Sequence, residues 1–208
     1  MAFVENAAAP PDPPAGPAPA KAHLRERVRA ARRARTPAER EDADRALAAV
    51  ALAAPPVAAL PAGAVVAAYA STPTEPGTGA LRTALRARGL VVLLPVVTAA
   101  DAALDWRVDE AEGSGVTAAL EQADVVLLPA LAVDAGGVRL GQGGGHYDRT
   151  LAALQEAEPA RRPLLVAVVH AEEVLPDGAV PAEPHDVRVD AVLTPTSWQH
   201  LPGGGCGQ

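Results

Sequence analysis

Residues 123–157 read ADVVLLPALAVDAGGVRLGQGGGHYDRTLAALQEA, and this stretch decides the fold. Its first seven residues form an apolar run rich in β-branched side chains, which predicts a buried strand. Residues 147–157 predict a helix. A strand, a glycine loop and a helix in this order place backbone N–H groups at the carboxyl end of a strand, where open α/β sheets bind ligands.

Four of the five residues in 141–145 are glycine, with Gln142 between them. Without side chains in the way, successive N–H groups can converge on a phosphate. Asp148 follows the last glycine by three residues, where its carboxylate could hold magnesium against the same phosphates. The run is neither a P-loop nor a dinucleotide fingerprint, because it lacks a following lysine and has His146 where glycine is required. A plain turn is the alternative, since glycine clusters are common in loops.

The remaining apolar pattern predicts a single three-layer α/β/α domain with a mostly parallel, mixed sheet of Rossmann-like type. Residues 21–54 predict one or two helices. The expected strands are 65–70, 90–97, 124–129, 164–169 and 191–194, and the other expected helices are 79–88 and 147–157.

The domain is expected to span residues 21–198. Residues 1–20 hold six prolines and many alanines, which predicts a disordered tail. Residues 199–208 are rich in glycine at their end and are expected to form a flexible tail.

Composition excludes several classes of protein. A net charge of −7 argues against general nucleic-acid binding, and no run of 18 or more apolar residues predicts a membrane span. The single cysteine, Cys206, cannot form an internal disulfide. This favours a reducing compartment, and a cytoplasmic protein is expected.

The first expected helix is strongly basic and contains Lys21, the one lysine among eighteen basic residues. Lys21 and Arg25 are four residues apart and therefore share a helical face. Arginines at 25–35 favour a solvated face, and nucleic-acid binding through them is an alternative.

Several segments together resemble the 5-formyltetrahydrofolate cyclo-ligase family, also called methenyltetrahydrofolate synthetases. The resemblance covers roughly Lys21 to Thr196. It rests on Lys21-Ala-His-Leu-Arg25, Tyr69-Ala-Ser71 through Glu75, Leu128-Pro129 through Arg149, Glu183-Pro-His185-Asp186, and Val189-Asp190-Ala-Val-Leu-Thr194.

The resemblance implies an enzyme that uses ATP and Mg²⁺ to cyclise 5-formyltetrahydrofolate to 5,10-methenyltetrahydrofolate, releasing ADP and phosphate. It implies phosphorylation of the formyl oxygen, followed by attack of the N10 nitrogen. The expected partners are these two small molecules, with no nucleic acid and no membrane, and the chain is expected to be a monomer.

Site residues follow from the resemblance by position. Lys21 and Arg139 are expected to be catalytic, and Glu75, Gln142 and His146 to contact the folate. Asp148 and Asp186 are expected to bind the metal. The expected nucleotide contacts are Lys21, Arg25, Arg139, Leu140, Gly141, Gln142, Gly143, Gly144, Gly145, His146 and Tyr147.

The chain also departs from the family pattern. Family members often carry a basic residue at the position of Gln142 or Gly144, so a diverged nucleotide-binding protein of the same fold without folate turnover is the alternative. Trp106 and Trp198 could stack on a pterin, although packed aromatic side chains are the commoner outcome.

Overall fold

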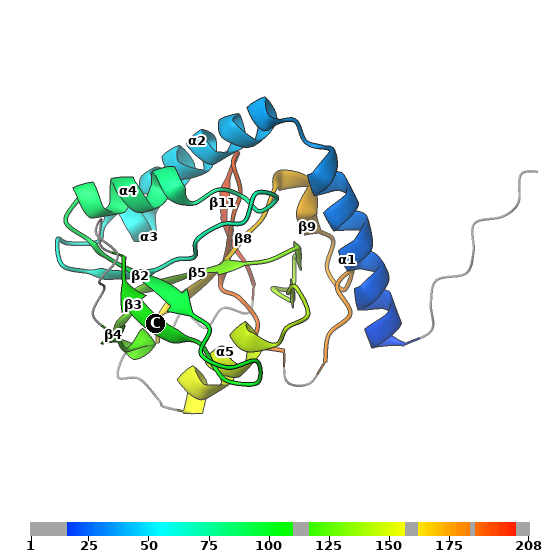
Figure 1. Ribbon diagram of the computed structural model, residues 1–208. Coiled ribbons are helices and arrows are strands. Elements are labelled where there is room, and N and C mark those ends of the chain that lie inside the picture. Colours follow the sequence, from blue (N-terminus) through cyan, green and yellow to red (C-terminus); the bar gives the residue numbers. More distant parts are fainter. Residues whose placement is uncertain (1–15, 110–116, 157–161, 184–185, 203–208) are drawn as a thin grey trace, which may run out of the picture.

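The computed structural model describes residues 16–109, 117–156, 162–183 and 186–202, and it contains two sheets with helices around them (Figure 1). The helices are α1 (Pro17–Ala34), α2 (Pro37–Ala53), α3 (Pro55–Ala58), α4 (Gly79–Ala87) and α5 (His146–Glu156), with 3₁₀ turns at Leu120–Gln122 and Ala171–Glu173. The strands are β1 (Val65–Ala67), β2 (Val91–Val96), β3 (Asp105–Val108), β4 (Thr117–Ala118), β5 (Val125–Pro129), β6 (Ala132–Asp134), β7 (Arg139–Leu140), β8 (Leu164–Val168), β9 (Val174–Leu175), β10 (Ala191–Leu193) and β11 (Trp198–His200).

The main sheet has the order β11-β10-β8-β5-β1-β2-β3-β4. Its centre, from β10 to β2, is parallel, and β11, β3 and β4 add antiparallel pairs at the two edges. The expectation of a mostly parallel, mixed sheet in an α/β fold is therefore confirmed. The expected strands 65–70 and 90–97 and the expected helix 79–88 form a βαβ unit, β1-α4-β2, with Val65 paired to Val91.

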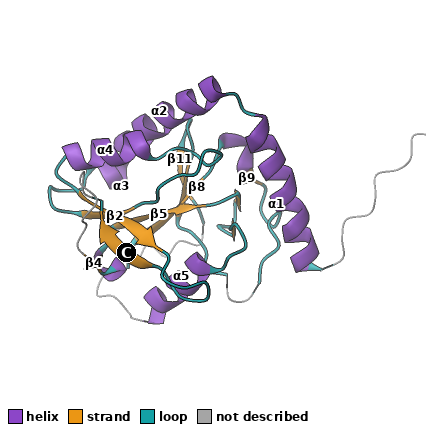
Figure 2. Ribbon diagram, viewed as in Figure 1, coloured by secondary structure: helices purple, strands orange, loops and turns teal. Residues whose placement is uncertain are grey.

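The sheet is buried on both faces because its strands alternate apolar side chains between two cores. In β5, Val125 and Leu127 belong to one core, whereas Val126 and Leu128 belong to the other. Helices α2 and α4 cover the first face and α5 covers the second, as Figures 1 and 2 show. This accounts for the continuous apolar runs, since a strand covered on both sides has no solvent-facing positions.

Helix α1 packs beside the small sheet, which has the order β7-β6-β9, and it lies next to β9 in Figure 1. Leu24 and Val28 contact a third core that includes Leu131 and Leu140. The expected direct succession of strand 124–129 and the glycine loop is wrong. The β6–β7 hairpin intervenes, and its strands are too short to show a periodic pattern.

Two elements extend past the expected bounds of the domain. Helix α1 begins at Pro17, inside the expected 1–20 tail, because proline suits the first turn of a helix, where its missing N–H is not needed. The expected 199–208 tail begins within β11, which pairs with β10, and Leu201 beyond it is buried. Residues 1–15 and 203–208 lie outside the described residues.

A buried ion pair joins α1 to the turn after β8. Arg32 donates from Nε and Nη2 to Glu173 at 2.7 Å, and Nη2 also donates to the Ala130 carbonyl at 2.6 Å. Burial, together with the Arg35 and Arg32 charges, lowers the pKa of nearby His170 to about 4, so this imidazole is neutral at pH 7. The Arg32–Glu173 pair, together with the more exposed Arg35–Glu172 pair, holds the C-terminal end of α1 against this turn.

Replacing Arg32 with methionine is expected to lower the free energy of unfolding by about 3–5 kcal/mol, because Glu173 would remain as an uncompensated buried charge. Urea unfolding of the variant measures this loss. The double variant Arg32→Met/Glu173→Met should recover part of it, and Arg27→Met, an exposed position on the same helix, should change stability by less than about 0.5 kcal/mol. Equal stability of Arg32→Met and the unsubstituted protein would contradict this role.

Candidate functional site

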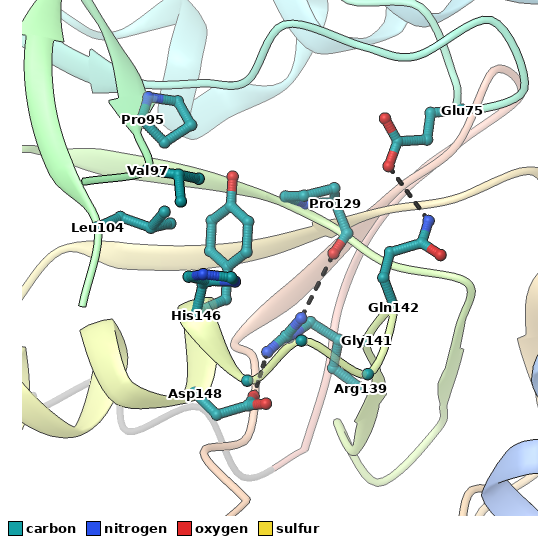
Figure 3. Close-up of a pocket in the computed structure, with 14 residues that line it drawn as sticks. Glu75, Pro95, Val97, Leu104, Pro129, Arg139, Gly141, Gln142, His146 and Asp148 are labelled. Atoms are coloured by element: carbon teal, nitrogen blue, oxygen red, sulfur yellow. Dashed lines mark hydrogen bonds and ion pairs between the residues drawn. The ribbon is translucent and has the colours of Figure 1, made fainter. Parts of the chain in front are cut away.

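A pocket of about 220 Å³ lies where the parallel strands end (Figure 3). Pro95 comes from β2, Pro129 from the end of β5, and Glu75 from the loop after β1. The chain runs outward from β1 to β2 on one side and through β5, β8 and β10 on the other, so the strand order reverses between β1 and β5. Ligands in open α/β sheets bind outside the carboxyl ends at such a reversal. The pocket lies in this position.

One wall of the pocket is apolar and the opposite wall carries hydrogen-bonding groups. Pro95, Val97 and Leu104 form the apolar wall, whereas Glu75 and Gln142 lie across from it (Figure 3). Val97 is 62% exposed, an unusual state for a large apolar side chain in this otherwise well-buried structure. An apolar surface facing a few oriented polar groups suits a flat heterocyclic ligand.

The glycine loop forms the floor next to α5. Gly143 and Gly145 have φ values of +102° and +70°, which side-chain-bearing residues rarely adopt. A Cβ on Gly145 would also come within 2.6 Å of Arg149 Nη1. The loop ends at the N-terminus of α5, where unpaired backbone N–H groups and the helix dipole favour anions. Gly141, Gly143, Gly144 and Gly145 all line the pocket, and their contact with a nucleotide stays a prediction.

Arg139 lies beneath this loop and is 7% exposed. Its Nη2 donates to Asp148 Oδ1 at 2.5 Å, and Nη1 donates to the Pro129 carbonyl at 3.4 Å. The guanidinium lies 5.8 Å from the centre of the Tyr147 ring. Burial raises the pKa of Tyr147, which keeps its hydroxyl protonated at neutral pH. Arg139 thus connects the end of β5 to the first turn of α5.

The other predicted loop residues divide between pocket and core. His146 and Tyr147 line the pocket, and His146 Nε2 has no hydrogen-bond partner among the described residues. Leu140 does not line it: its side chain is 1% exposed in the core beside α1. Its backbone carbonyl accepts from Leu131 N at 2.8 Å, so that group is also committed to the fold.

The basic face of α1, defined here as Lys21, Arg25, Arg29 and Arg32, contacts the protein. Lys21 is 6% exposed and donates to Glu183 at 2.6 Å and Asp186 at 2.9 Å. Burial alone would lower the pKa of Lys21, but the hydrogen bonds and charges of these two carboxylates outweigh it and raise the pKa. The expectation of a solvated face is wrong for the buried Lys21 and Arg32, whereas Arg25 is half-buried and Arg29 is exposed.

Arg25 and Arg29 attach this face to the glycine loop. Arg25 Nε donates to the Gly141 carbonyl at 2.9 Å. Arg29 Nη2 donates to the Gln142 carbonyl at 2.8 Å and to Gln142 Oε1 at 3.0 Å. The roles of Arg29 and Arg32 were missed from sequence, although the spacings of four, four and three residues from Lys21 onward already place all four cations on one face.

The predicted folate contacts meet across the pocket. Gln142 Nε2 donates to Glu75 Oε1 at 3.3 Å, joining the loop after β1 to the glycine loop (Figure 3). Glu75 Oε2 also accepts from Thr72 N at 2.8 Å, which orients the carboxylate. The tryptophans are elsewhere: Trp106 is packed in the core beneath α5 and Trp198 against the opposite core, so packing is confirmed over stacking in this pocket.

The two predicted metal ligands are each paired with a cation. Asp148 accepts from Arg139, and Asp186 accepts from Lys21. Asp186 Oδ2 also accepts from Glu183 N at 2.8 Å. Within the described part of the chain, no group of three or more His, Cys, Asp or Glu side chains is arranged to hold a metal ion by itself. Whether Asp148 and Asp186 share one ion stays a prediction.

Several known proteins are similar to this chain in sequence or in fold. The 5-formyltetrahydrofolate cyclo-ligase of Mycolicibacterium smegmatis is 39% identical over 151 residues, which are 64% of this chain and 74% of that protein. The NMR structure of Aquifex aeolicus 5,10-methenyltetrahydrofolate synthetase gives a TM-score of 0.70 at 21% identity, covering 90% of this chain and 96% of that chain. The Mycoplasma pneumoniae 5,10-methenyltetrahydrofolate synthetase gives 0.66 at 22% identity, covering 84% and 98%. At these identities the two structures show the fold alone.

A model of the 5-formyltetrahydrofolate cyclo-ligase family matches residues 17–195, which include α1, the glycine loop and the residues that line the pocket. The chain therefore belongs to the 5-formyltetrahydrofolate cyclo-ligase family.

Proposed function

We propose that this chain cyclises 5-formyltetrahydrofolate to 5,10-methenyltetrahydrofolate in an ATP-dependent ligase reaction, the activity of its family. The observation that carries the proposal is the shared pocket. The phosphate-binding type of loop, Gly141–Gly145, and the pair Glu75–Gln142 line one cavity. A nucleotide phosphate and a folate formyl group can therefore approach each other there.

The reaction must activate a weak electrophile. The formyl carbon on N5 is amide-like, and hydroxide is a poor leaving group. Transfer of the γ-phosphoryl group of ATP to the formyl oxygen makes phosphate the leaving group in place of hydroxide. The N10 lone pair then attacks the formyl carbon, the C–O bond breaks with release of phosphate, and N10 loses its proton. The protein mainly positions the two substrates and neutralises charge.

The lining residues are assigned by their place around the pocket, whereas Lys21 and Arg25, which do not line it, are assigned by the family resemblance. The N–H groups of the glycine loop and the start of α5 bind phosphate oxygens, because they are oriented donors at a positive helix end. Arg139 stabilises negative charge that builds up during transfer. Lys21 and Arg25 bind the nucleotide phosphates from the α1 side, and Glu75 accepts hydrogen bonds from pterin N–H groups. His146 and Gln142 complete the folate contacts.

Asp148 and Asp186 fit a magnesium ion that arrives with the nucleotide. Magnesium in such sites takes one or two protein carboxylates and completes its coordination with phosphate oxygens and water, so a three-residue cluster is not needed. When bound, the ion neutralises charge on the phosphates. The two carboxylates are held by Arg139 and Lys21, cations that can turn to phosphate instead.

Two alternatives are less well supported. Nucleic-acid binding through α1 would need its arginines free, yet Arg25, Arg29 and Arg32 bind protein groups. A diverged protein without folate turnover was suggested because Gln142 stands where family members often carry a basic residue. Arg29, however, brings a guanidinium to Gln142.

None of the described helices is long and apolar enough to cross a membrane. A cytoplasmic monomer remains our proposal.

The activity is tested by absorbance of the methenyl product when purified protein meets 5-formyltetrahydrofolate, ATP and magnesium. Product formation should require all three components. ATP binding without product would instead support the diverged nucleotide-binding protein.

Replacing Lys21 with methionine is expected to raise the KM for ATP at least about tenfold, because one charge-assisted contact to phosphate is lost. The KM for the folate should change much less. Steady-state kinetics with each substrate varied in turn measures both, and thermal unfolding checks that the variant folds. Arg27→Met provides the matched control on the same helix. Unchanged ATP kinetics in a folded Lys21→Met variant would remove Lys21 from the site.

Replacing Asp148 with asparagine keeps the shape of the side chain and removes its charge. The magnesium concentration for half-maximal activity should rise about tenfold or more, because a carboxylate ligand of a hard cation is lost. Magnesium titrations at fixed ATP measure the shift, with the exposed Asp105→Asn as control. An Asp148→Asn variant with the magnesium dependence of the unsubstituted protein would exclude Asp148 as a ligand.

A further inference from the structure

Arg149, in the first turn of α5, directs its guanidinium at backbone carbonyl groups. Its Nε donates to the Ala102 carbonyl at 3.2 Å, and its Nη2 donates to the carbonyls of Ala100 at 3.0 Å and Gly144 at 3.1 Å. Within the described part of the chain, its side chain makes no other hydrogen bond and no ion pair. Arg149 does not line the pocket, and the reaction proposed above gives it no role.

Arg149 fixes both peptide groups that flank Gly145. Its side chain holds the Gly144 carbonyl, and its own main-chain N–H donates to the Gly145 carbonyl at 3.0 Å. The peptide bonds of the described residues are all trans, and in a trans peptide the carbonyl and the following N–H point in opposite directions. The Gly145 N–H therefore points away from the guanidinium, and the His146 N–H points away from the body of α5.

These two N–H groups are free to bind a ligand. Neither the Gly145 N–H nor the His146 N–H donates to any group among the residues that the structure describes, and both residues line the pocket. Adjacent backbone donors at a helix N-terminus suit an anion such as a phosphate group. The side chain and the main chain of Arg149 thus each set the direction of one such donor.

The orientation at Gly145 needs an external partner. Gly145 has a φ value of +70°, and glycine adopts either sign of φ at little cost, so sterics alone leave the direction of the Gly144–Gly145 peptide open. A reversed peptide would present the Gly144 carbonyl oxygen to a phosphate, and two negative groups repel each other. Because Ala100 and Ala102 also hold the guanidinium, it offers the Gly144 carbonyl a fixed partner.

We propose that Arg149 is a positioning residue of the nucleotide site, which holds the Gly144 carbonyl behind the loop so that the Gly145 N–H faces the phosphate. The inference rests on the proposed function and deepens it by naming what directs one of the phosphate-binding donors. A direct contact between Arg149 and phosphate is the alternative. It is disfavoured because Arg149 lies outside the pocket lining and carbonyls occupy its Nε and Nη2.

The test follows individual backbone amides by ¹⁵N NMR while MgATP is titrated into the full chain and into Arg149→Met. Methionine removes the guanidinium but keeps the main-chain N–H that holds the Gly145 carbonyl, so the His146 amide is an internal control. The Gly143 amide, whose preceding carbonyl is held by Arg29, is a second one. Arg27→Met, exposed and distant in sequence, is the control variant, and thermal unfolding checks that each variant folds.

In the unsubstituted protein, the amide resonances of Gly143, Gly145 and His146 should all shift on binding MgATP. In Arg149→Met the shift at Gly145 should be largely lost, whereas Gly143 and His146 should keep theirs. MgATP should bind at least about fivefold more weakly, because one hydrogen bond to a charged group is no longer preorganised. Arg27→Met should behave as the unsubstituted protein.

Arg149→Lys separates the geometry of the side chain from its charge. An ammonium group cannot reproduce the planar fork that serves carbonyls of two segments, so lysine should restore little of the Gly145 shift or of the MgATP affinity. Full recovery with lysine would overturn the proposal, because charge alone would then suffice.

Two results with the amides would also overturn the proposal. Equal losses at Gly143, Gly145 and His146 in Arg149→Met would mean that Arg149 supports the whole loop or binds phosphate itself. A Gly145 amide that ignores MgATP in the unsubstituted protein would mean that it is not a phosphate donor. Binding is measured without turnover, so a selective loss at Gly145 in a protein that forms no methenyl product would support this role while contradicting the proposed reaction.

Discussion

The structure depends on the attachment of α1 to the rest of the domain through its basic face. Charged side chains that face a protein interior must be paired, since an unpaired buried charge costs several kcal/mol. Lys21 and Arg32 meet this requirement with carboxylates from segments about 140–165 residues away along the chain. Arg25 and Arg29 add bonds to the glycine loop. One helix thereby fixes the loop, the turn after β8 and the segment around Asp186 relative to one another.

The site combines this attachment with the topology of the sheet. The reversal of strand order between β1 and β5 opens a crevice at their carboxyl ends, and the β6–β7 hairpin returns the chain so that the glycine loop closes over it. Both predicted magnesium carboxylates are paired with cations that are also predicted to bind ATP. In the proposed reaction, phosphate and metal would replace these pairs together, because the nucleotide would offer anions to the arginine and lysine while the ion takes the carboxylates.

The sheet could be predicted because β5 and β8 are covered on both faces and so read as continuous apolar runs. Strands β6, β7 and β9 have two or three residues each, too few for a period, and the hairpin that separates β5 from the loop was missed. The glycine loop, Arg139 and Glu75 were predicted to belong to one site and line one pocket. The burial of Lys21 was not foreseen, because helical spacing groups the cations on one face without indicating that acidic partners will cover it.

The most direct measurement is a crystal structure of the full chain with a non-hydrolysable ATP analogue, magnesium and 5-formyltetrahydrofolate. The account predicts one magnesium ion within about 2.1 Å of a carboxylate oxygen of Asp148 and of Asp186, the distance typical of this ion. Phosphate oxygens should contact Lys21, Arg25 and the glycine loop, and the pterin should contact Glu75. A magnesium ion bound away from either aspartate, or phosphates that leave α1 untouched, would contradict the account.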